Sequence, residues 1–216
     1  MSFFLTDDLK GDLSIAKKSP SKQYVGDWCD AWEVDRVSGD CDYCPVCGRP
    51  VSMLKWLKPR KMRLTNTKYP DRLTAWLSEP LVISERCISV FEEAEISGIK
   101  RFDPIEVVKV AHMTKNSSKP PSYFCAEIDY AMCVRVDPDK STIIGQKTDW
   151  CCELCNPWGS TVDHIEKLVL DTVHWDGTDI FRVYSLGVVV SQRFLDVVLK
   201  NNMTNFNLVS VDDYQR

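Results

Sequence analysis

The chain has 216 residues, of which 44% are hydrophobic and 27% are charged, and its formal net charge is −4. That composition is ordinary for a soluble globular protein with a sizeable core in one or two domains. The acidic balance argues against a nucleic-acid-binding protein, which needs a basic surface for phosphate contacts. No apolar run approaches the roughly 20 residues of a membrane-spanning helix, so we expect no membrane contact.

The N-terminus, Met1–Asp8, lacks the basic stretch and long apolar run of a signal peptide. We therefore expect a cytoplasmic protein, and we expect its ten cysteines to be reduced thiols. Residues 1–40 are expected to form a lead-in with an early strand at Phe3–Leu5 and an acidic segment after it.

That acidic and aromatic segment spans residues 27–42, where Trp28 and Trp32 stand four apart and would share one face of a short helix. Two interpretations are open. The helix docks both indoles in the core and leaves the acids in water, or the segment offers an acidic, aromatic patch to a cationic partner. On the second interpretation, the candidate partner contacts are Trp28, Asp30, Trp32 and Glu33, joined by Trp175, Asp176 and Asp179 from a later turn.

The chain has two Cys-x-x-Cys loops that are far apart in the sequence: Cys44-Pro45-Val46-Cys47-Gly48 and Cys152-Glu153-Leu154-Cys155-Asn156. Two intervening residues let both sulfurs of a loop face one point, and four thiolates complete the tetrahedral shell that structural zinc prefers. The residue after the second cysteine usually takes a positive φ, which Gly tolerates freely and Asn at small cost. We therefore expect one zinc ion bound by Cys44, Cys47, Cys152 and Cys155, with no open position for catalysis.

Other uses of these cysteines remain open. A redox pair would open a helix, but Gly48-Arg49-Pro50 is a poor helix start. Cys41 also stands at Cys-x-x-Cys spacing from Cys44, and Cys151 adjoins Cys152, so either could replace a neighbouring ligand. The chosen register is the one in which both loops end in Gly or Asn.

Five basic residues surround Trp56 between Lys55 and Arg63. Such a run is typical of a solvated face. The alternative is a zinc-ribbon nucleic-acid-binding or transcription accessory module that uses Lys55–Arg63 as its contact. The acidic net charge favours the solvated face.

Residues 80–98 have the pattern of strand, cap, helix and stop. Leu81–Ile83 is a short apolar strand, Ser84 is a good N-cap, and apolar residues then repeat at helical spacing. Gly98 is expected to end the helix in a left-handed conformation. Ile99–Ala111 then resembles a strand broken by Pro104.

The same order returns near the C-terminus, where Ser191 follows an apolar strand and Asn205 takes the place of Gly98. Ser84 and Ser191 are 191 − 84 = 107 residues apart, close to the spacing of the cysteine loops. We infer an α+β fold with an internal duplication, in which a zinc-ribbon-like clamp of four cysteines joins two strand–Ser-capped helix–strand halves. The expected divisions are residues 1–40, a first repeat unit at 41–114, connecting strands at 115–149 and a second repeat unit at 150–216.

Residues typical of enzymes are sparse. The three histidines, His112, His164 and His174, form no familiar metal-binding pair, and Gly-rich phosphate loops and nucleophile elbows are missing. The sequence therefore predicts a non-catalytic binding protein with no small-molecule substrate.

With these motifs, the chain resembles the double-CxxCG immunity proteins of bacterial polymorphic-toxin systems and related toxin-immunity families. The matching parts are Cys44–Gly48, Cys152–Cys155, Leu81–Phe102 and Val188–Val211, with Asn156 where that family has its second Gly. The resemblance implies a cytoplasmic inhibitor that is encoded beside a secreted toxin, binds that one cognate toxin and has no catalytic residues.

Overall fold

The computed structural model describes residues 2–6, 30–34, 37–75, 81–184 and 186–215, and within these ranges the chain is a mixed α+β structure. The expected α+β class is confirmed. The helices are α2 (Glu85–Glu93) and α3 (Gln192–Lys200), and a 3-10 turn covers Val211–Asp213. The strands are β1 (Phe3–Thr6), β2 (Asp30–Val34), β3 (Arg60–Leu64), β4 (Arg72–Ala75), β5 (Leu81–Ser84), β6 (Ile99–Val110), β7 (Tyr123–Ile128), β8 (Arg135–Val136), β9 (Thr142–Ile144), β10 (His164–Lys167), β11 (Leu170–Asp171), β12 (Ile180–Val183), β13 (Gly187–Ser191) and β14 (Leu208–Ser210).

Six strands close a barrel in the order β2-β3-β6-β7-β5-β4. The pairs β2–β4 and β3–β6 are parallel, and the other neighbours are antiparallel. Because side chains alternate along a strand, β3 turns Met62 and Leu64 inward, each 1% exposed, and Arg63 outward. The barrel therefore has a core of its own.

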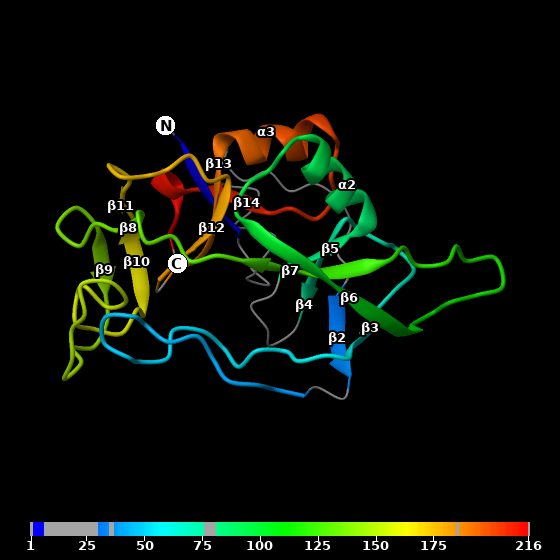
Figure 1. Cartoon of the computed structure of the whole chain (residues 1–216), viewed down its shortest axis with the longest axis horizontal. Helices are drawn as coiled ribbons and strands as arrows, with labels where there is room; N and C mark the ends of the chain where they lie inside the picture. The colour runs from blue at the N-terminus through cyan, green and yellow to red at the C-terminus, as the bar shows by residue number, and fades with distance from the viewer. Residues whose placement is uncertain (1, 7–29, 35–36, 76–80, 185, 216) are drawn as a thin grey trace.

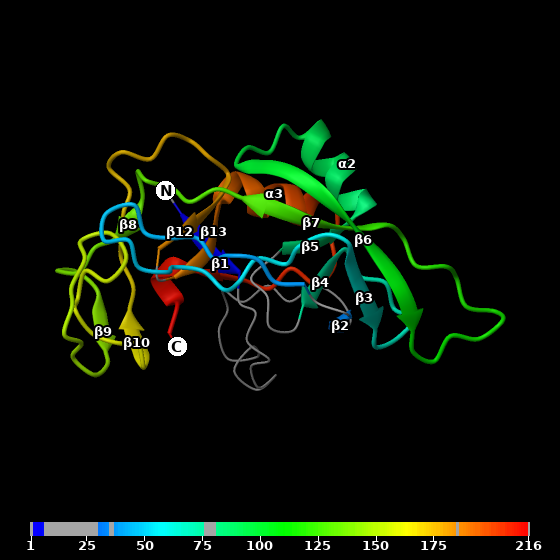
Figure 2. The same ribbon diagram turned by 60° about the horizontal axis from the view of Figure 1, so that its bottom comes forward.

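A four-stranded antiparallel sheet has the order β12-β13-β1-β14 (Figure 1). The N-terminal strand β1 lies between β13 and β14, where Phe4 is paired with Val190 on one side and with Ser210 on the other. The expected strand at Phe3–Leu5 is confirmed, and it completes a sheet whose other strands come from the C-terminal part of the chain. Two short ladders, β8–β11 and β9–β10, lie at the same end of the molecule (Figure 1), and Figure 2 shows β8, β9 and β10 there from another side.

Both helices begin at the predicted serines. The Oγ of Ser84 accepts a hydrogen bond from the backbone N–H of Cys87, and the Oγ of Ser191 accepts one from Phe194. These bonds satisfy N–H groups that the first turn of a helix leaves unpaired. The two predicted caps are confirmed.

The helices end earlier than the sequence suggested. Left-handed conformations occur at Glu95 (φ 51°) and Asn202 (φ 48°), directly after the C-caps, and again at Gly98 (φ 102°) and Asn205 (φ 67°). Gly98 and Asn205 are thus left-handed as expected, but they shape the loops that lead into the next strands.

Strand β6 runs unbroken through Pro104, where a break was expected. Pro104 is paired with Phe124 of β7, and the ladder with β3 begins one residue later, where Ile105 is opposite Arg60. The missing N–H of Pro104 therefore falls at the end of a ladder, a position at which a strand tolerates proline.

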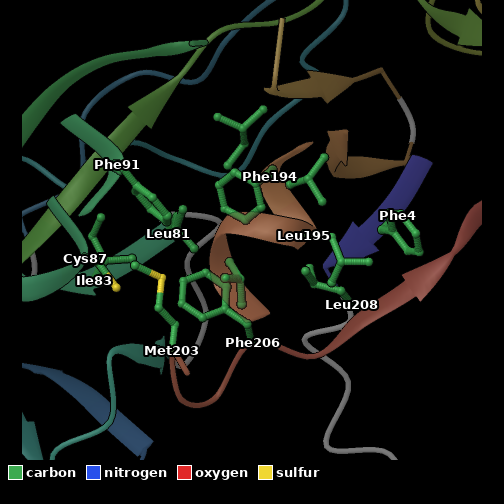
Figure 3. Close-up of a cluster of buried hydrophobic side chains, with 14 residues drawn as sticks. Phe4, Leu81, Ile83, Cys87, Phe91, Phe194, Leu195, Met203, Phe206 and Leu208 are labelled. Atoms are coloured by element: carbon green, nitrogen blue, oxygen red, sulfur yellow. The ribbon is translucent and has the colours of Figure 1, made fainter. Parts of the chain in front are cut away.

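One apolar core joins the barrel to the four-stranded sheet (Figure 3). The rings of Phe91 and Phe194 lie 5.0 Å apart between centroids, and Phe206 lies 6.3 Å and 6.1 Å from them. The same cluster includes Leu81 of β5 and Phe4 of β1. Each fully buried Phe contributes about 1.5–3 kcal/mol, so this cluster holds the two sheets together.

A buried aspartate, Asp71, lies directly before β4 and collects contacts from both halves of the chain. Its carboxylate accepts hydrogen bonds from Ser84 Oγ at 3.1 Å and from Thr204 N at 2.9 Å. It also pairs with the guanidinium of Arg86 at 2.6 Å. Asp71 thereby holds the cap of α2 and the loop that follows α3.

A second buried aspartate, Asp179, makes the matching set of contacts. Its carboxylate accepts from Ser191 Oγ at 3.0 Å and from Ser97 N at 3.1 Å, and it pairs with Arg193 at 2.5 Å. Asp179 thereby holds the cap of α3 and the loop that follows α2, which is the reverse of what Asp71 does.

Candidate metal centre and partner-contact residues

Residues 37–57 leave the barrel between β2 and β3 as a hairpin-like excursion, here called the arm. Backbone hydrogen bonds cross it, from Leu57 N to Val37 O and from Val51 N to Asp42 O, each at 2.8 Å. The arm runs along the molecule from β2 and β3 towards the end that holds β9 and β10 (Figure 1). It thereby carries the first cysteine loop to the second half of the chain.

The first cysteine loop forms the tip of the arm. Cys44 N donates to Arg49 O at 2.8 Å, and Gly48 N donates to Cys44 O at 2.9 Å, which closes a tight turn. Gly48 has a φ of 69°, so the prediction of a left-handed glycine at this position is confirmed.

The second cysteine loop turns differently. Asn156 is not among the described residues with positive φ, so the prediction of a left-handed Asn here is wrong. Instead, Cys152 and Asn156 exchange two backbone hydrogen bonds of 3.1 Å and 3.0 Å, and the Asn156 amide donates to Thr148 Oγ1 at 3.2 Å. The left-handed turn comes at Gly159, with a φ of 61°. The Asn156 side chain thus braces the loop.

The two loops meet. The four sulfurs of Cys44, Cys47, Cys152 and Cys155 all lie within 4.8 Å of one another. Cys44 Sγ is 3.8 Å from Cys152 Sγ, and Cys47 Sγ is 3.5 Å from Cys155 Sγ. Four sulfurs bound to one zinc ion at about 2.3 Å would lie about 3.8 Å apart, so this cluster has the size of a tetrahedral metal site. The four cysteines can therefore hold a metal ion.

The surroundings favour a thiolate at one position of the cluster. Burial raises the pKa of the Cys152 thiol, but the backbone N–H groups of Cys155 and Leu154 outweigh this effect and lower the pKa to about 7. Burial raises the pKa of Cys155. A thiolate is the form of cysteine that binds a metal, and a bound cation would stabilise the remaining thiolates.

Aromatic side chains brace the two loops from outside the cluster. The guanidinium carbon of Arg49 lies 4.5 Å from the ring centroid of Trp150, which links the tip of the arm to the second loop. The rings of Tyr130 and Tyr184 stack at 4.4 Å, and Tyr130 Oη donates to Val51 O at 3.3 Å. Contacts other than the cysteines therefore also hold the arm against the second half.

Three of the five cations in the basic run at Lys55–Arg63 are paired with acids. Lys55 pairs with Asp42 at 2.6 Å, while Lys58 and Arg60 both pair with Asp103, at 2.5 Å and 2.9 Å. Cations that are already paired contribute little to phosphate binding. This geometry favours the solvated-face interpretation over the nucleic-acid-binding one.

The predicted helix around Trp32 is wrong, because Asp30–Val34 is strand β2 of the barrel. Ala31 is 2% exposed and faces inward, and Trp32 is 41% exposed. Glu33 is half-buried. Trp28 and the side chain of Asp30 lie outside the described part of the chain, so their roles as contacts stay predictions.

The second predicted group, residues 175–179, forms the turn before β12. The ring of Trp175 packs edge-on against Phe3 at 5.2 Å, and its Nε1 donates to Thr178 O. Asp176 is exposed and accepts hydrogen bonds from Thr178 N and Oγ1. Asp179 is 2% exposed, and its carboxylate is committed to internal partners, so it offers no surface to another protein.

Comparison with protein-family models decides the family. The model of the immunity protein family Imm11 matches residues 48–213. The chain belongs to the Imm11 family. The Imm11 match includes both helices and the second cysteine loop, but it begins just after Cys47, so the first two cysteines of the cluster lie outside it.

The narrower resemblance to double-CxxCG immunity proteins is not confirmed by the Imm11 match. No curated protein matches the chain. Neither α2 nor α3, the helices of the described part, has the length and apolar character needed to cross a bilayer.

Proposed function

We propose that the protein neutralises a cognate secreted toxin by binding it in the cytoplasm, without catalysis. The observation that carries this proposal is membership of the Imm11 immunity family across residues 48–213. An inhibitor of this kind needs a rigid surface more than it needs reactive groups. The interlocked aspartate networks and the shared core supply such rigidity.

We also propose that the metal is a structural zinc ion. The donor set consists only of thiolates, which zinc prefers, and it leaves no open coordination position for a substrate. Cys44 and Cys47 come from the arm, whereas Cys152 and Cys155 come from the loop before β10, so the ion would fasten segments 108 residues apart. The ion would hold the tip of the arm against the loop before β10.

An internal duplication is the third part of the proposal, with repeat units at 41–114 and 150–216 and connecting strands at 115–149. Its support is the strand order β4-β5-β7-β6, which corresponds to β12-β13-β1-β14 with all neighbours antiparallel. The register agrees as well, because Arg72 is paired with Ile83 as Ile180 is paired with Val190. On this proposal, β1 from the N-terminus takes the place beside β13 that β7, from the connecting segment, has beside β5.

Toxin neutralisation is tested with the toxin domain encoded next to this chain. Its expression in a bacterial host should arrest growth, and co-expression of the immunity protein should restore it. The purified proteins should elute as a 1:1 complex in size-exclusion chromatography with light scattering. An Imm11 protein paired with a different toxin serves as the control. If the folded protein neither restores growth nor binds this toxin domain, the proposed function is wrong.

A further inference from the structure

One exposed row of side chains crosses three strands of the barrel. Trp32 of β2 is paired with Arg63 of β3, and Arg63 is paired with Lys109 of β6. Side chains directly opposite each other on neighbouring strands point to the same face. All three are exposed, whereas Ala31 and Met62, which precede Trp32 and Arg63 in their strands, face the core. The barrel therefore presents an indole beside two cations.

The row borders a hollow of about 340 Å³. Trp32, Arg63 and Lys109 line it, together with the half-buried Glu33. A side chain of a partner protein would fit a hollow of this size. Trp and Arg are also the residue types most enriched where alanine substitution weakens protein–protein binding.

The surface around the hollow is cationic, although the chain as a whole carries a net charge of −4. Residues 61–69 include Lys61, Arg63 and Lys68 and no acidic residue, and Lys109 of β6 adds a fourth cation beside the hollow. The acids on the same strands are Asp30, whose side chain lies outside the described part of the chain, and Glu33, Asp103 and Glu106. Asp103 is paired with Lys58 and Arg60, and Glu106 lies opposite Lys61 in the ladder. This end of the barrel therefore has an excess of positive charge.

We propose that the Trp32–Arg63–Lys109 row is the docking site for an acidic segment of the toxin, an inference that rests on the proposed function. The indole packs against the apolar stem of the incoming segment, and the guanidinium and ammonium groups pair with its carboxylates. The sequence suggested an acidic patch around Trp32 for a basic partner. The register of β2 against β3, and of β3 against β6, instead places two cations beside Trp32, so we propose an acidic partner. A protein segment fits better than nucleic acid, because the three adjoining cations at 55–60 are all paired with Asp42 or Asp103 and do not extend the row into a longer basic track.

The test measures the affinity of the neighbouring toxin domain for four forms of the full-length protein. These are the wild type, Trp32→Ala, the double variant Arg63→Glu with Lys109→Glu, and a control in which Lys147→Glu is combined with Lys167→Glu. The control makes the same charge change at exposed lysines of the other half. Thermal melts check that every form is folded, and fluorescently labelled duplex DNA is titrated in parallel.

The expected result is that Trp32→Ala weakens toxin binding by about 30-fold or more, as truncation of a binding hot spot does. The Arg63/Lys109 reversal should weaken it further, and the wild-type affinity should fall as salt rises, whereas the control stays within about threefold. Equal binding by the wild type and the Arg63/Lys109 reversal would overturn the docking site while leaving the proposed function intact. Duplex binding that the reversal abolishes, with toxin binding unchanged, would identify a nucleic-acid surface instead. A wild type that does not bind the toxin would overturn the proposed function and the docking site with it.

Discussion

Arg86 and Arg193 each bind the C-terminal end of the other's helix. The guanidinium of Arg86, near the start of α2, donates to the carbonyl of Asn201 after α3. The guanidinium of Arg193, near the start of α3, donates to the carbonyl of Ala94 after α2. A cation at a helix C-terminus satisfies unpaired carbonyls and opposes the negative end of the helix dipole. The two helices are therefore locked reciprocally, with Asp71 and Asp179 orienting the two arginines.

This reciprocity predicts matched losses of stability. Asp71→Asn and Asp179→Asn should each lower the free energy of unfolding by about 2 kcal/mol, because each removes the charged acceptor of a serine, an arginine and a backbone N–H. Urea unfolding at neutral pH measures both. Asp129→Asn is the control, since the carboxylate of Asp129 is half exposed and pairs with the half-exposed Lys100, so its loss should change stability little.

If one aspartate substitution lowers the free energy of unfolding and the other leaves it unchanged, the two networks are not equivalent. That result would count against the duplication proposal. Combining both substitutions adds a second check. The two carboxylates hold the same pair of helices, so their effects should not be additive.

Gly98 is expected to tolerate no side chain. A Cβ built at Gly98 would lie 1.8 Å from the carbonyl oxygen of Ile180, and its φ of 102° disfavours any residue with a Cβ. Gly98→Ala should therefore cost about 1–2 kcal/mol for the backbone conformation and a further 1–3 kcal/mol, roughly, for overpacking. The measurement is the midpoint of thermal unfolding.

Gly177→Ala is the matched control for Gly98→Ala. Gly177 has a similar φ of 93°, but a Cβ there would meet nothing within 4 Å. It should show the conformational cost alone. Equal losses at the two glycines would mean that the close approach between Gly98 and Ile180 contributes nothing to stability.

The acid sensitivity of the barrel should depend on Asp103. Burial raises the pKa of this carboxyl, but Lys58, Arg60 and Arg101 outweigh burial and hold the pKa below its ordinary value of 3.8. A carboxyl whose pKa is lower in the folded state stabilises the protein above the unfolded-state pKa, and this contribution is lost as pH falls through the folded-state pKa. Asp103→Asn should therefore destabilise the protein at pH 7, and the difference from wild type should shrink as pH falls below about 4.

Urea unfolding of wild type and Asp103→Asn at a series of pH values measures this difference, and carbon NMR of the carboxyl follows its titration directly. Asp129→Asn is the control, because Asp129 is half exposed and pairs with the exposed Lys100. A stability difference that grows as the solution becomes more acidic would contradict the assigned pairing.

Local chemistry predicted the parts of the fold that depend on neighbouring residues. Ser84 and Ser191 could be recognised as caps, and Gly48 as a left-handed turn, because each follows from the requirements of one helix end or one loop. The pairing of distant cysteines could be anticipated because thiolates at this spacing have few other uses in reduced proteins.

The features that could not be predicted depend on pairing between residues that are far apart in the sequence. A five-residue segment around Trp32 fits a helix or a strand, and its partners β3 and β4 select the strand. Asp71 carries no motif, and it was missed although its 108-residue offset from Asp179 was available as a signal. Lys109 was missed as a contact candidate because its neighbour Arg63 is far away in sequence and their pairing exists only in the barrel.

Substitution of a cluster cysteine should remove the bound metal ion, whereas substitution of a neighbouring cysteine should not. Cys44→Ser or Cys155→Ser should reduce bound zinc from about one ion per chain to nearly none, because three thiolates no longer close the tetrahedral shell. Structural zinc contributes roughly 10–16 kcal/mol in small peptides. Here the core and the Arg49–Trp150 contact also hold the arm, so we expect a smaller loss, about 3 kcal/mol, which lowers the melting temperature by roughly 6–12 °C. Elemental analysis and thermal unfolding are the measurements.

Cys41→Ser and Cys151→Ser are the matched controls for zinc binding, since both thiols adjoin the cluster without belonging to it. They should keep the ion and the melting temperature of the wild type. Loss of zinc in Cys151→Ser together with full zinc in Cys152→Ser would show that Cys151, and not Cys152, is the ligand at that position.

Removal of the metal with a chelator should also make the backbone of the arm more accessible to solvent, because the cluster fastens its tip to the loop before β10. Hydrogen exchange across residues 37–57 should therefore rise when zinc is removed, while exchange within α2 and α3 stays slow, since the phenylalanine core and the reciprocal arginines do not involve the metal.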